Sequence, residues 1–284
     1  MNVLVTGCYG QLGRALQKLA ALESQHQWFF TDVDTLDITD GSAVETYFQQ
    51  HQIQACINCA AYTAVDQAED EPELAMKINA DAPQRLAEAC LRNHALLIHV
   101  STDYVFDGKA DTPYLESDAV NPQSVYGSTK AEGERRIQQS GCRHLIVRTA
   151  WLYSSNGKNF VKTMLRLGDT KEEINVVDDQ RGCPTWAHDL AVALTLLLNQ
   201  NQDKEVHELY HFTNEGSITW CDFASTIMEI AQKPCKVNPI SSDQYPTKAH
   251  RPAYSVLNLE KIKKDTGMNI PFWKDSLIKC MEEL

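Results

Sequence analysis

Residues 3–13 read VLVTGCYGQLG, a short apolar run that leads directly into three glycines in the pattern G-x-x-G-x-x-G. This order predicts a buried strand, a tight turn and the start of a helix. In that setting Gly7 permits the turn, Gly10 lets the backbone approach a pyrophosphate, and Gly13 lets the helix lie close to the strand. The N–H groups at the start of the helix would bind the phosphates. A glycine-rich turn without a ligand is the alternative interpretation of these glycines alone.

Short apolar runs alternate with helical patterns through the first half of the chain. The apolar runs lie at 3–5, 28–30, 55–58, 96–100 and 145–147. Alternation of this kind predicts a parallel sheet with helices on both faces, and strands buried on both sides are almost wholly apolar. We therefore expect an α/β fold with a Rossmann-type doubly wound parallel sheet, whose ligands bind beyond the carboxyl ends of the strands.

The pattern becomes less regular after Trp151. Helical spacing recurs at 160–167, 187–198 and 223–231, separated by loops that contain proline and glycine. We predict an NAD(P)-binding Rossmann domain in residues 1–150. Residues 151–284 are expected to form mainly a smaller C-terminal substrate-binding domain, with some segments that return to the Rossmann core.

Composition excludes several classes of partner. Among 284 residues, 26 Lys and Arg face 38 Asp and Glu, which gives a net charge of −12. An acidic surface repels phosphate backbones, so we expect no nucleic-acid partner. No basic leader precedes the first apolar run, and no apolar stretch reaches the roughly 18–20 residues that span a membrane. We expect a cytoplasmic protein without a membrane anchor.

Nine cysteines form an odd set without framework spacing, which favours reduced thiols. Cys56 and Cys59 have C-x-x-C spacing, but they lie in an apolar run typical of a strand, and no second pair completes a zinc site. We interpret them as small buried residues.

An acidic residue ends the second predicted strand. Asp32 lies 19 residues beyond Gly13, where an acid often meets the adenosine ribose of a dinucleotide. This favours NAD, but it does not exclude NADP.

A tyrosine and a lysine follow at helical spacing. Tyr126 and Lys130 are four residues apart and would share one helix face. A lysine ammonium lowers the pKa of a neighbouring phenol, which makes tyrosine a usable proton donor to a carbonyl. Thr102, just after the fourth apolar run, would hydrogen-bond the carbonyl oxygen. A surface Tyr–Lys pair is the alternative, but the glycine loop and the threonine together favour an NAD(P)-dependent oxidoreductase.

These residues together resemble the extended short-chain dehydrogenase/reductases and, more narrowly, the dTDP-4-dehydrorhamnose reductase family. The matching stretches keep the family's order along nearly the whole chain. They are GQLG (10–13), AAYTAVD (60–66), STDYVF (101–106), VYGSTK (125–130), RTAWLY (148–153), NFV (159–161), DQRGCPT (179–185) and RP (251–252).

The resemblance implies reduction of the C4 keto group of dTDP-4-dehydro-L-rhamnose to dTDP-L-rhamnose with NADPH or NADH. Tyr126 would donate the proton, Lys130 would tune Tyr126 and bind the ribose, and Thr102 would hydrogen-bond the reacting oxygen. Asp103 and Trp151 would touch the sugar nucleotide. The dinucleotide site would be lined, besides Tyr126 and Lys130, by Gly7, Gly10, Gln11, Leu12, Gly13, Asp32, Asp37, Ile38, Ala61, Tyr62 and Thr63.

Some assignments keep an alternative. Arg251 is the cation that we assign to the substrate diphosphate. An acidic protein that binds a dianion needs a local positive charge, and a guanidinium can bind a phosphate through two parallel hydrogen bonds. A surface arginine without a ligand is the other interpretation. Trp151 could be a core aromatic, and residues 179–182 could be only a turn. Some family members dimerise through magnesium held by glutamates, one of them in the first helix. Residues 14–16 offer no acid there, so we expect no metal, and a monomer or a homodimer without a metal bridge.

Two rival functions follow from the same fold. One is another nucleotide-sugar dehydratase or epimerase of the superfamily. The dehydratases carry an Asp-Glu pair after the threonine, whereas here Asp103 is followed by Tyr104, which argues against elimination. The other is a non-catalytic binding subunit, because a regulatory subunit of methionine adenosyltransferase resembles this fold. The presence of Thr102, Tyr126 and Lys130 favours an enzyme.

Overall fold

A six-stranded sheet forms the centre of the protein in the computed structural model, which describes residues 1–22 and 24–284. All five ladders are parallel, and the strand order is β10-β5-β4-β3-β1-β2. The strands are β1 (Asn2–Thr6), β2 (Gln27–Thr31), β3 (Ala55–Asn58), β4 (Leu96–Thr102), β5 (His144–Thr149) and β10 (His207–His211). The predicted α/β fold with a Rossmann-type parallel sheet is confirmed.

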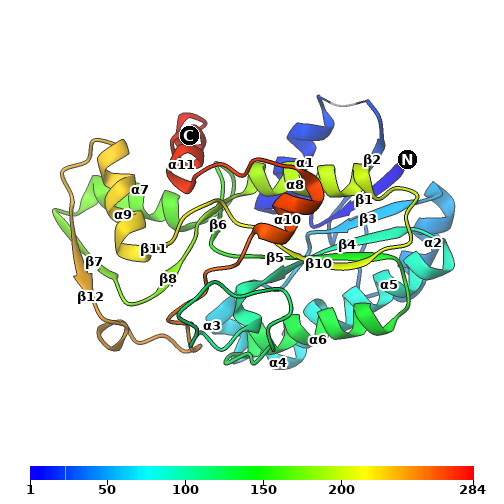
Figure 1. Ribbon diagram of the computed structural model, residues 1–284, viewed down its shortest axis with the longest axis horizontal. Coiled ribbons are helices and arrows are strands. Elements are labelled where there is room, and N and C mark those ends of the chain that lie inside the picture. The colour runs from blue at the N-terminus through cyan, green and yellow to red at the C-terminus, as the bar shows by residue number, and fades with distance from the viewer. Residues whose placement is uncertain (23) are drawn as a thin grey trace.

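Helices cover both faces of this sheet (Figure 1). One face carries α1 (Gln11–Ala20), α8 (Ala187–Gln200) and α10 (Glu260–Thr266), and the other carries α2 (Gly41–His51), α5 (Ala82–Arg92) and α6 (Val125–Gln139). Side chains of a strand point to alternate faces. Val3 and Val5 therefore pack in the first core, and Leu4 packs in the second.

Segments from beyond residue 150 take part in the central layer. β10 pairs with β5 at the edge of the sheet, and α8 shares the first core with α1. The division of the chain into two domains at residue 150 stays a prediction.

The rest of the second half forms a smaller lobe with its own core. Figure 1 shows α7, α9, β7 and β12 at the end of the long axis away from the sheet. This lobe contains α7 (Phe160–Thr170), α9 (Trp220–Ile230), α11 (Trp273–Glu282) and three strand pairs. The pairs are β7 (Glu173–Val177) with β12 (Lys236–Ile240), β6 (Leu152–Tyr153) with β9 (Thr185–Trp186), and β8 (Arg181–Gly182) with β11 (Ile218–Thr219).

Short helices position α6 under the sheet. They are α3 (Val65–Ala68), α4 (Pro72–Met76), the π-helical turn η1 (Lys77–Asp81) and the 3₁₀ turn η2 (Asp103–Val105); a further 3₁₀ turn is η3 (Ser242–Gln244). Gly133 of α6 lies against η1 so closely that a Cβ built there would overlap the carbonyl oxygen of Asn79. In the described part of the chain, no helix has both the length and the apolar character to cross a membrane.

Candidate active site

A cavity of about 780 Å³ lies where the strands end. Gly7, Asp32, Cys59, Thr102 and Thr149, each at or just beyond the carboxyl end of a sheet strand, all line it. The cavity therefore occupies the position at which parallel α/β sheets bind ligands. The predicted site residues that line it are Gly7, Gly10, Gln11, Leu12, Gly13, Asp32, Asp37, Ile38, Ala61, Thr63, Thr102, Asp103, Tyr126, Lys130 and Trp151.

The glycine loop has the geometry that its sequence predicts. Gly7 has a φ of +66°, and a Cβ on Gly13 would come within 2.5 Å of the Cα of Cys8. Gly10 is different, because a Cβ there would meet only the carbonyl oxygen of Gly7, at 3.2 Å. α1 begins at this point without a side-chain cap and without an acid in its first turn. The loop thus leaves space and backbone N–H groups for an anion, which fits a dinucleotide pyrophosphate.

Asp32 is joined to the glycine loop. Its Oδ2 accepts a hydrogen bond from the backbone N–H of Tyr9 at 2.9 Å, and its Oδ1 accepts one from the N–H of Val33 at 2.9 Å. Because a carboxylate has about four acceptor positions, Asp32 can hold the loop and still accept hydrogen bonds from a ribose.

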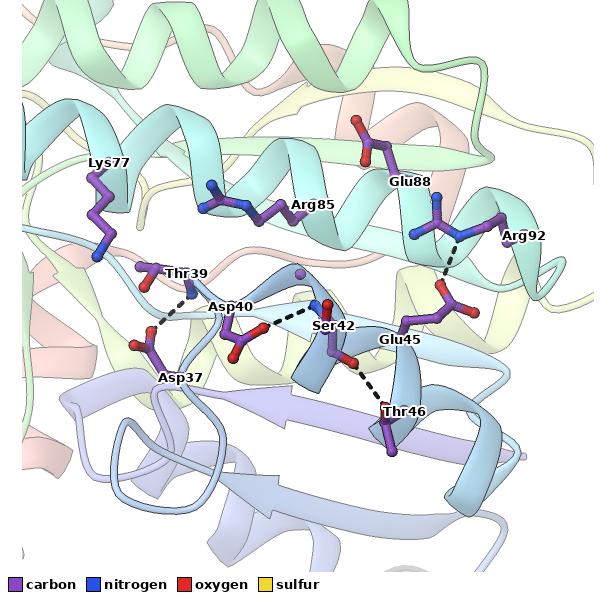
Figure 2. A pocket seen from close by; sticks show the side chains of 11 residues that line it. Asp37, Thr39, Asp40, Ser42, Glu45, Thr46, Lys77, Arg85, Glu88 and Arg92 are labelled. Carbon is purple, nitrogen blue, oxygen red and sulfur yellow. Dashed lines mark hydrogen bonds and ion pairs between the residues drawn. The ribbon is translucent and has the colours of Figure 1, made fainter.

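A second hollow, of about 890 Å³, adjoins the cavity at Asp37 and Thr39, which line both. Figure 2 shows Lys77 and Arg85 on the helical layer above the segment that carries Asp37. Hydrogen bonds from Thr39 lower the pKa of Asp37, and the two cations act in the same direction. Asp37 is therefore ionised at neutral pH and can accept hydrogen bonds where the resemblance predicts part of the dinucleotide.

Tyr126 lies in the first turn of α6, which is capped by the Ser124 hydroxyl through a 3.1 Å bond from the N–H of Gly127. A Cβ on Gly127 would overlap the carbonyl oxygen of Tyr104, so glycine lets α6 approach η2. This approach places Tyr126 beside Thr102 in the lining of the cavity.

Desolvation of the Tyr126 phenol raises its pKa. The spacing of Tyr126 and Lys130 predicts the opposite direction, from a nearby lysine ammonium. The difference arises because the Lys130 amine is turned to other partners: it donates to the carbonyl oxygen of Val100 at 2.6 Å and lies 3.3 Å from Nε2 of His99. Burial, at 2% exposure, lowers the pKa of Lys130 to about 8.

Thr102 ends β4 rather than following it, because the strand runs two residues further than the apolar run predicts. Its hydroxyl donates to Oδ1 of Asp103 at 2.9 Å. Asp103 Oδ2 and Ser101 Oγ are buried and have no hydrogen-bond partner within the described residues. Burial also raises the pKa of Asp103 to about 6. Buried polar atoms without a partner beside a cavity are the atoms that a polar ligand would satisfy.

Trp151 contributes an aromatic wall from the smaller lobe. Its ring stacks on Trp220 with centroids 3.6 Å apart and planes 12° apart. Its φ of +48° is unusual for a residue with a side chain, and such strain often accompanies function. The half-buried ring lines the cavity, so Trp151 has both a packing role and a position at the site.

The smaller lobe also holds the glycine loop. Oε1 of Gln11 accepts hydrogen bonds from Asn159 Nδ2 at 2.9 Å and from Ser154 Oγ at 3.2 Å. Lys158 and Asn159 line the cavity beside this contact. Sequence reasoning did not single out Lys158, and no spacing in the sequence pointed to it.

Two predicted residues do not line the cavity. Nη2 of Arg251 pairs with Asp66 at 2.6 Å, and its Nη1 donates to the Tyr104 hydroxyl at 3.0 Å. The Tyr62 hydroxyl donates to Glu71 at 2.7 Å. The ligand contacts expected for Arg251 and Tyr62 stay predictions.

No group of three or more His, Cys, Asp or Glu side chains with metal-binding geometry occurs within residues 1–22 and 24–284. The expectation that the protein needs no metal stays a prediction.

Comparison with known proteins gives the family. Residues 1–284 match the model described as RmlD substrate binding domain. A dTDP-4-dehydrorhamnose reductase of Aggregatibacter actinomycetemcomitans is 41% identical over 284 residues, which cover 97% of each chain. The crystal structure of such a reductase from Clostridium acetobutylicum has a TM-score of 0.94 at 42% identity and 99% coverage of both chains. The one from Bacillus anthracis, in complex with NADP, has a TM-score of 0.93 at 37% identity and covers 100% of this chain and 99% of its own.

The resemblance that the sequence motifs predicted is thereby confirmed, and the chain belongs to the RmlD substrate binding domain family.

Proposed function

We propose that this protein reduces the C4 keto group of dTDP-4-dehydro-L-rhamnose to give dTDP-L-rhamnose, with NADPH or NADH as hydride donor. The observation that carries the proposal is the single cavity that brings the glycine loop together with Thr102, Tyr126 and Lys130. The names of the relatives support the substrate, and the NADP in the Bacillus anthracis reductase supports the cofactor.

The cofactor supplies the hydride when it is bound, and the chain supplies its position. The backbone from Gly10 to Leu12 would hold the pyrophosphate, Asp32 the adenosine ribose, and Lys130 the nicotinamide ribose. Asp37, Ile38, Ala61 and Thr63 would line the rest of the dinucleotide site.

Tyr126 donates the proton to O4 of the keto-sugar in this proposal. Its raised pKa keeps the phenol protonated at neutral pH, which is the form that a donor needs in the reducing direction. Thr102, which lines the cavity beside Tyr126, would contact the substrate oxygen and fix the distance of transfer.

Asp103 and Trp151 hold the sugar nucleotide in this proposal. Asp103 Oδ2 and Ser101 Oγ would gain partners among the sugar hydroxyls, and the Trp151 ring would pack against the ligand. The neighbouring Tyr104 is held by Arg251 and is no carboxylate. It therefore cannot act as the second acid that a dehydratase uses.

We also propose that the protein acts in the cytoplasm, without a nucleic-acid partner, as a monomer or as a homodimer without a metal bridge. The net charge of −12 disfavours nucleic acid. All nine cysteines are free thiols, which fits a reducing compartment.

The test supplies the 4-keto sugar nucleotide with NADPH or NADH, follows the loss of reduced nicotinamide, and identifies the product by NMR. Stoichiometric oxidation with dTDP-L-rhamnose as product is expected. An epimerase or dehydratase would convert sugar nucleotides without net consumption of the cofactor. A folded protein that consumes no cofactor would overturn the proposal in favour of a binding subunit or of another keto-sugar.

A further inference from the structure

A chain of buried polar side chains leads from the sheet to the cavity. Thr6 of β1, Asn58 of β3, His99 of β4 and Lys130 of α6 are between 0% and 2% exposed. Asn58 Nδ2 lies 3.0 Å from Nδ1 of His99, whose Nε2 lies 3.3 Å from Lys130 Nζ. Lys130 has a role in the proposed reduction, whereas the imidazole beside it has none so far.

The orientation of the Asn58 amide is fixed by its neighbours. Its Oδ1 receives the Thr6 hydroxyl at 2.7 Å and the backbone N–H of Ala60 at 3.2 Å. A backbone N–H can only donate, so the oxygen must lie on this side and Nδ2 must face His99.

The tautomer of His99 follows from that orientation. The amide Nδ2 can only donate, so Nδ1 of His99 must accept and carries no proton. Burial and the neighbouring Lys130 lower the pKa of His99 well below its ordinary value, so the ring is neutral. A neutral imidazole has one ring proton, which must therefore be on Nε2, the atom that faces Lys130.

This tautomer discriminates between the two forms of Lys130. An ammonium has three donors and no acceptor, so it finds no acceptor on Nε2. A neutral amine has a lone pair that can accept from Nε2–H, while it still donates to Val100. The ring thus disfavours the charged form.

Other titratable groups face Lys130 from neighbouring elements. Glu134, on the same helix, favours the ammonium, but it is bound by Arg148 of β5 through two bonds of 2.6 and 2.9 Å. Cys59, beyond β3, is a neutral thiol because burial raises its pKa. Neither group offers the amine a hydrogen bond that discriminates between its two forms.

We propose that His99 is a positioning residue for Lys130: Asn58 locks the imidazole with its proton on Nε2, and this favours the neutral amine of the lysine. The proposed reductase function places this lysine at the nicotinamide ribose, where it lines the cavity. That role of Lys130 rests on the proposed function, whereas the tautomer lock does not.

The first experiment reads the tautomer directly, by NMR of the isotope-labelled full-length protein with NADPH bound and without it. A proton on Nε2 of His99 is expected in both states. A proton on Nδ1 would overturn the proposal, whether or not the protein turns over a keto-sugar.

The second experiment follows the titration of the labelled Lys130 side chain in wild type and in Asn58→Leu. Without the amide, Nε2 is free to accept from the ammonium. The pKa of Lys130 should then rise by about one unit, the size of one restored buried hydrogen bond. In the profile of kcat against pH, the inflection on the basic side should shift to higher pH together with the pKa of Lys130.

Thr6→Val is the matched control, because the Ala60 N–H still fixes Asn58; it should leave the lysine titration in place. A merely structural chain would lower the stability of both variants and move neither titration, and that result would refute the proposal. If Asn58→Leu does not fold, the tautomer of His99 in the wild type, read by NMR, decides whether the proposal holds.

Discussion

Replacing Gly13 by alanine tests whether this glycine is needed for the packing of α1 against the glycine loop or for ligand binding. The added Cβ would lie 2.5 Å from the Cα of Cys8 and from the carbonyl oxygen of Gly7. Both are backbone atoms that cannot rotate away. Overpacking of this kind costs about 1–3 kcal/mol of unfolding free energy, which lowers Tm by roughly 2–12 °C in a protein of this size.

Gly10→Ala is the matched variant. Its Cβ would meet only the carbonyl oxygen of Gly7, at 3.2 Å, and a φ of −70° suits alanine. The folded state should therefore lose less stability than in Gly13→Ala, because only one backbone atom has to move, and only slightly. The methyl group would instead occupy the space of the pyrophosphate, so NADPH affinity should fall at least about tenfold, or about 1.4 kcal/mol.

Thermal unfolding and NADPH titration by fluorescence separate the two effects. Gly13→Ala should show the larger fall in Tm, and Gly10→Ala should lose cofactor affinity with the smaller fall in Tm. If Gly10→Ala bound NADPH as tightly as the wild type, the assignment of this loop to the pyrophosphate would be wrong.

Three further predictions concern the site and its support. Thr102→Val should lower kcat by roughly 10–100-fold in steady-state assays, through loss of a hydrogen bond to the reacting oxygen, while the Kd for NADPH stays unchanged. Arg148→Met should lower the free energy of urea unfolding by about 3–5 kcal/mol, because it leaves Glu134 buried without its partner, and adding Glu134→Gln should recover part of that loss. Asp103→Asn should stabilise the protein above pH 6. The pKa of Asp103 in the folded protein is raised to about 6, so the free energy of unfolding of the wild type falls as the pH rises from about 4 to 6, by about 3 kcal/mol in all. The asparagine variant does not have this loss. Urea unfolding at pH 4 and pH 8 measures the difference in unfolding free energy between the variant and the wild type. A difference that is absent at pH 8, or equal at the two pH values, would contradict a raised pKa of Asp103.

Apolar runs indicate the strands that the sequence predicts, and most of these strands are buried on both faces. Val3, Leu4 and Val5 are fully buried, as is typical of strands covered on both faces. The edge strand β2 was also predicted, because its residues 28–30 are apolar although they are only half-buried. β10 was not predicted, because its sequence HELYH contains no apolar run and its first two residues, His207 and Glu208, are exposed. Its partner strand β5 lies more than 60 residues away in the chain. An edge strand of this composition has no local signature.

Likewise, some residues of the candidate site follow from local sequence patterns and others do not. Tyr126 and Lys130 were found because they share a helix face, and the glycines were found because they share a turn. His99 was not found, because it lies within an apolar run and its partner Lys130 is 31 residues away. Arg251 was selected for its charge, but the sequence could not show that Asp66, distant in the chain, pairs with it.

The most direct test of the proposed mechanism compares wild type with Tyr126→Phe in the oxidation of NADPH by the 4-keto sugar nucleotide, with cofactor binding measured alongside. The proposal predicts turnover in the wild type and a fall in kcat of about 100-fold or more in the variant, since a positioned proton donor contributes roughly 10²–10⁴-fold, while the Kd for NADPH stays within a factor of a few. A variant that turns over as fast as the wild type would show that another group delivers the proton, and it would contradict the account.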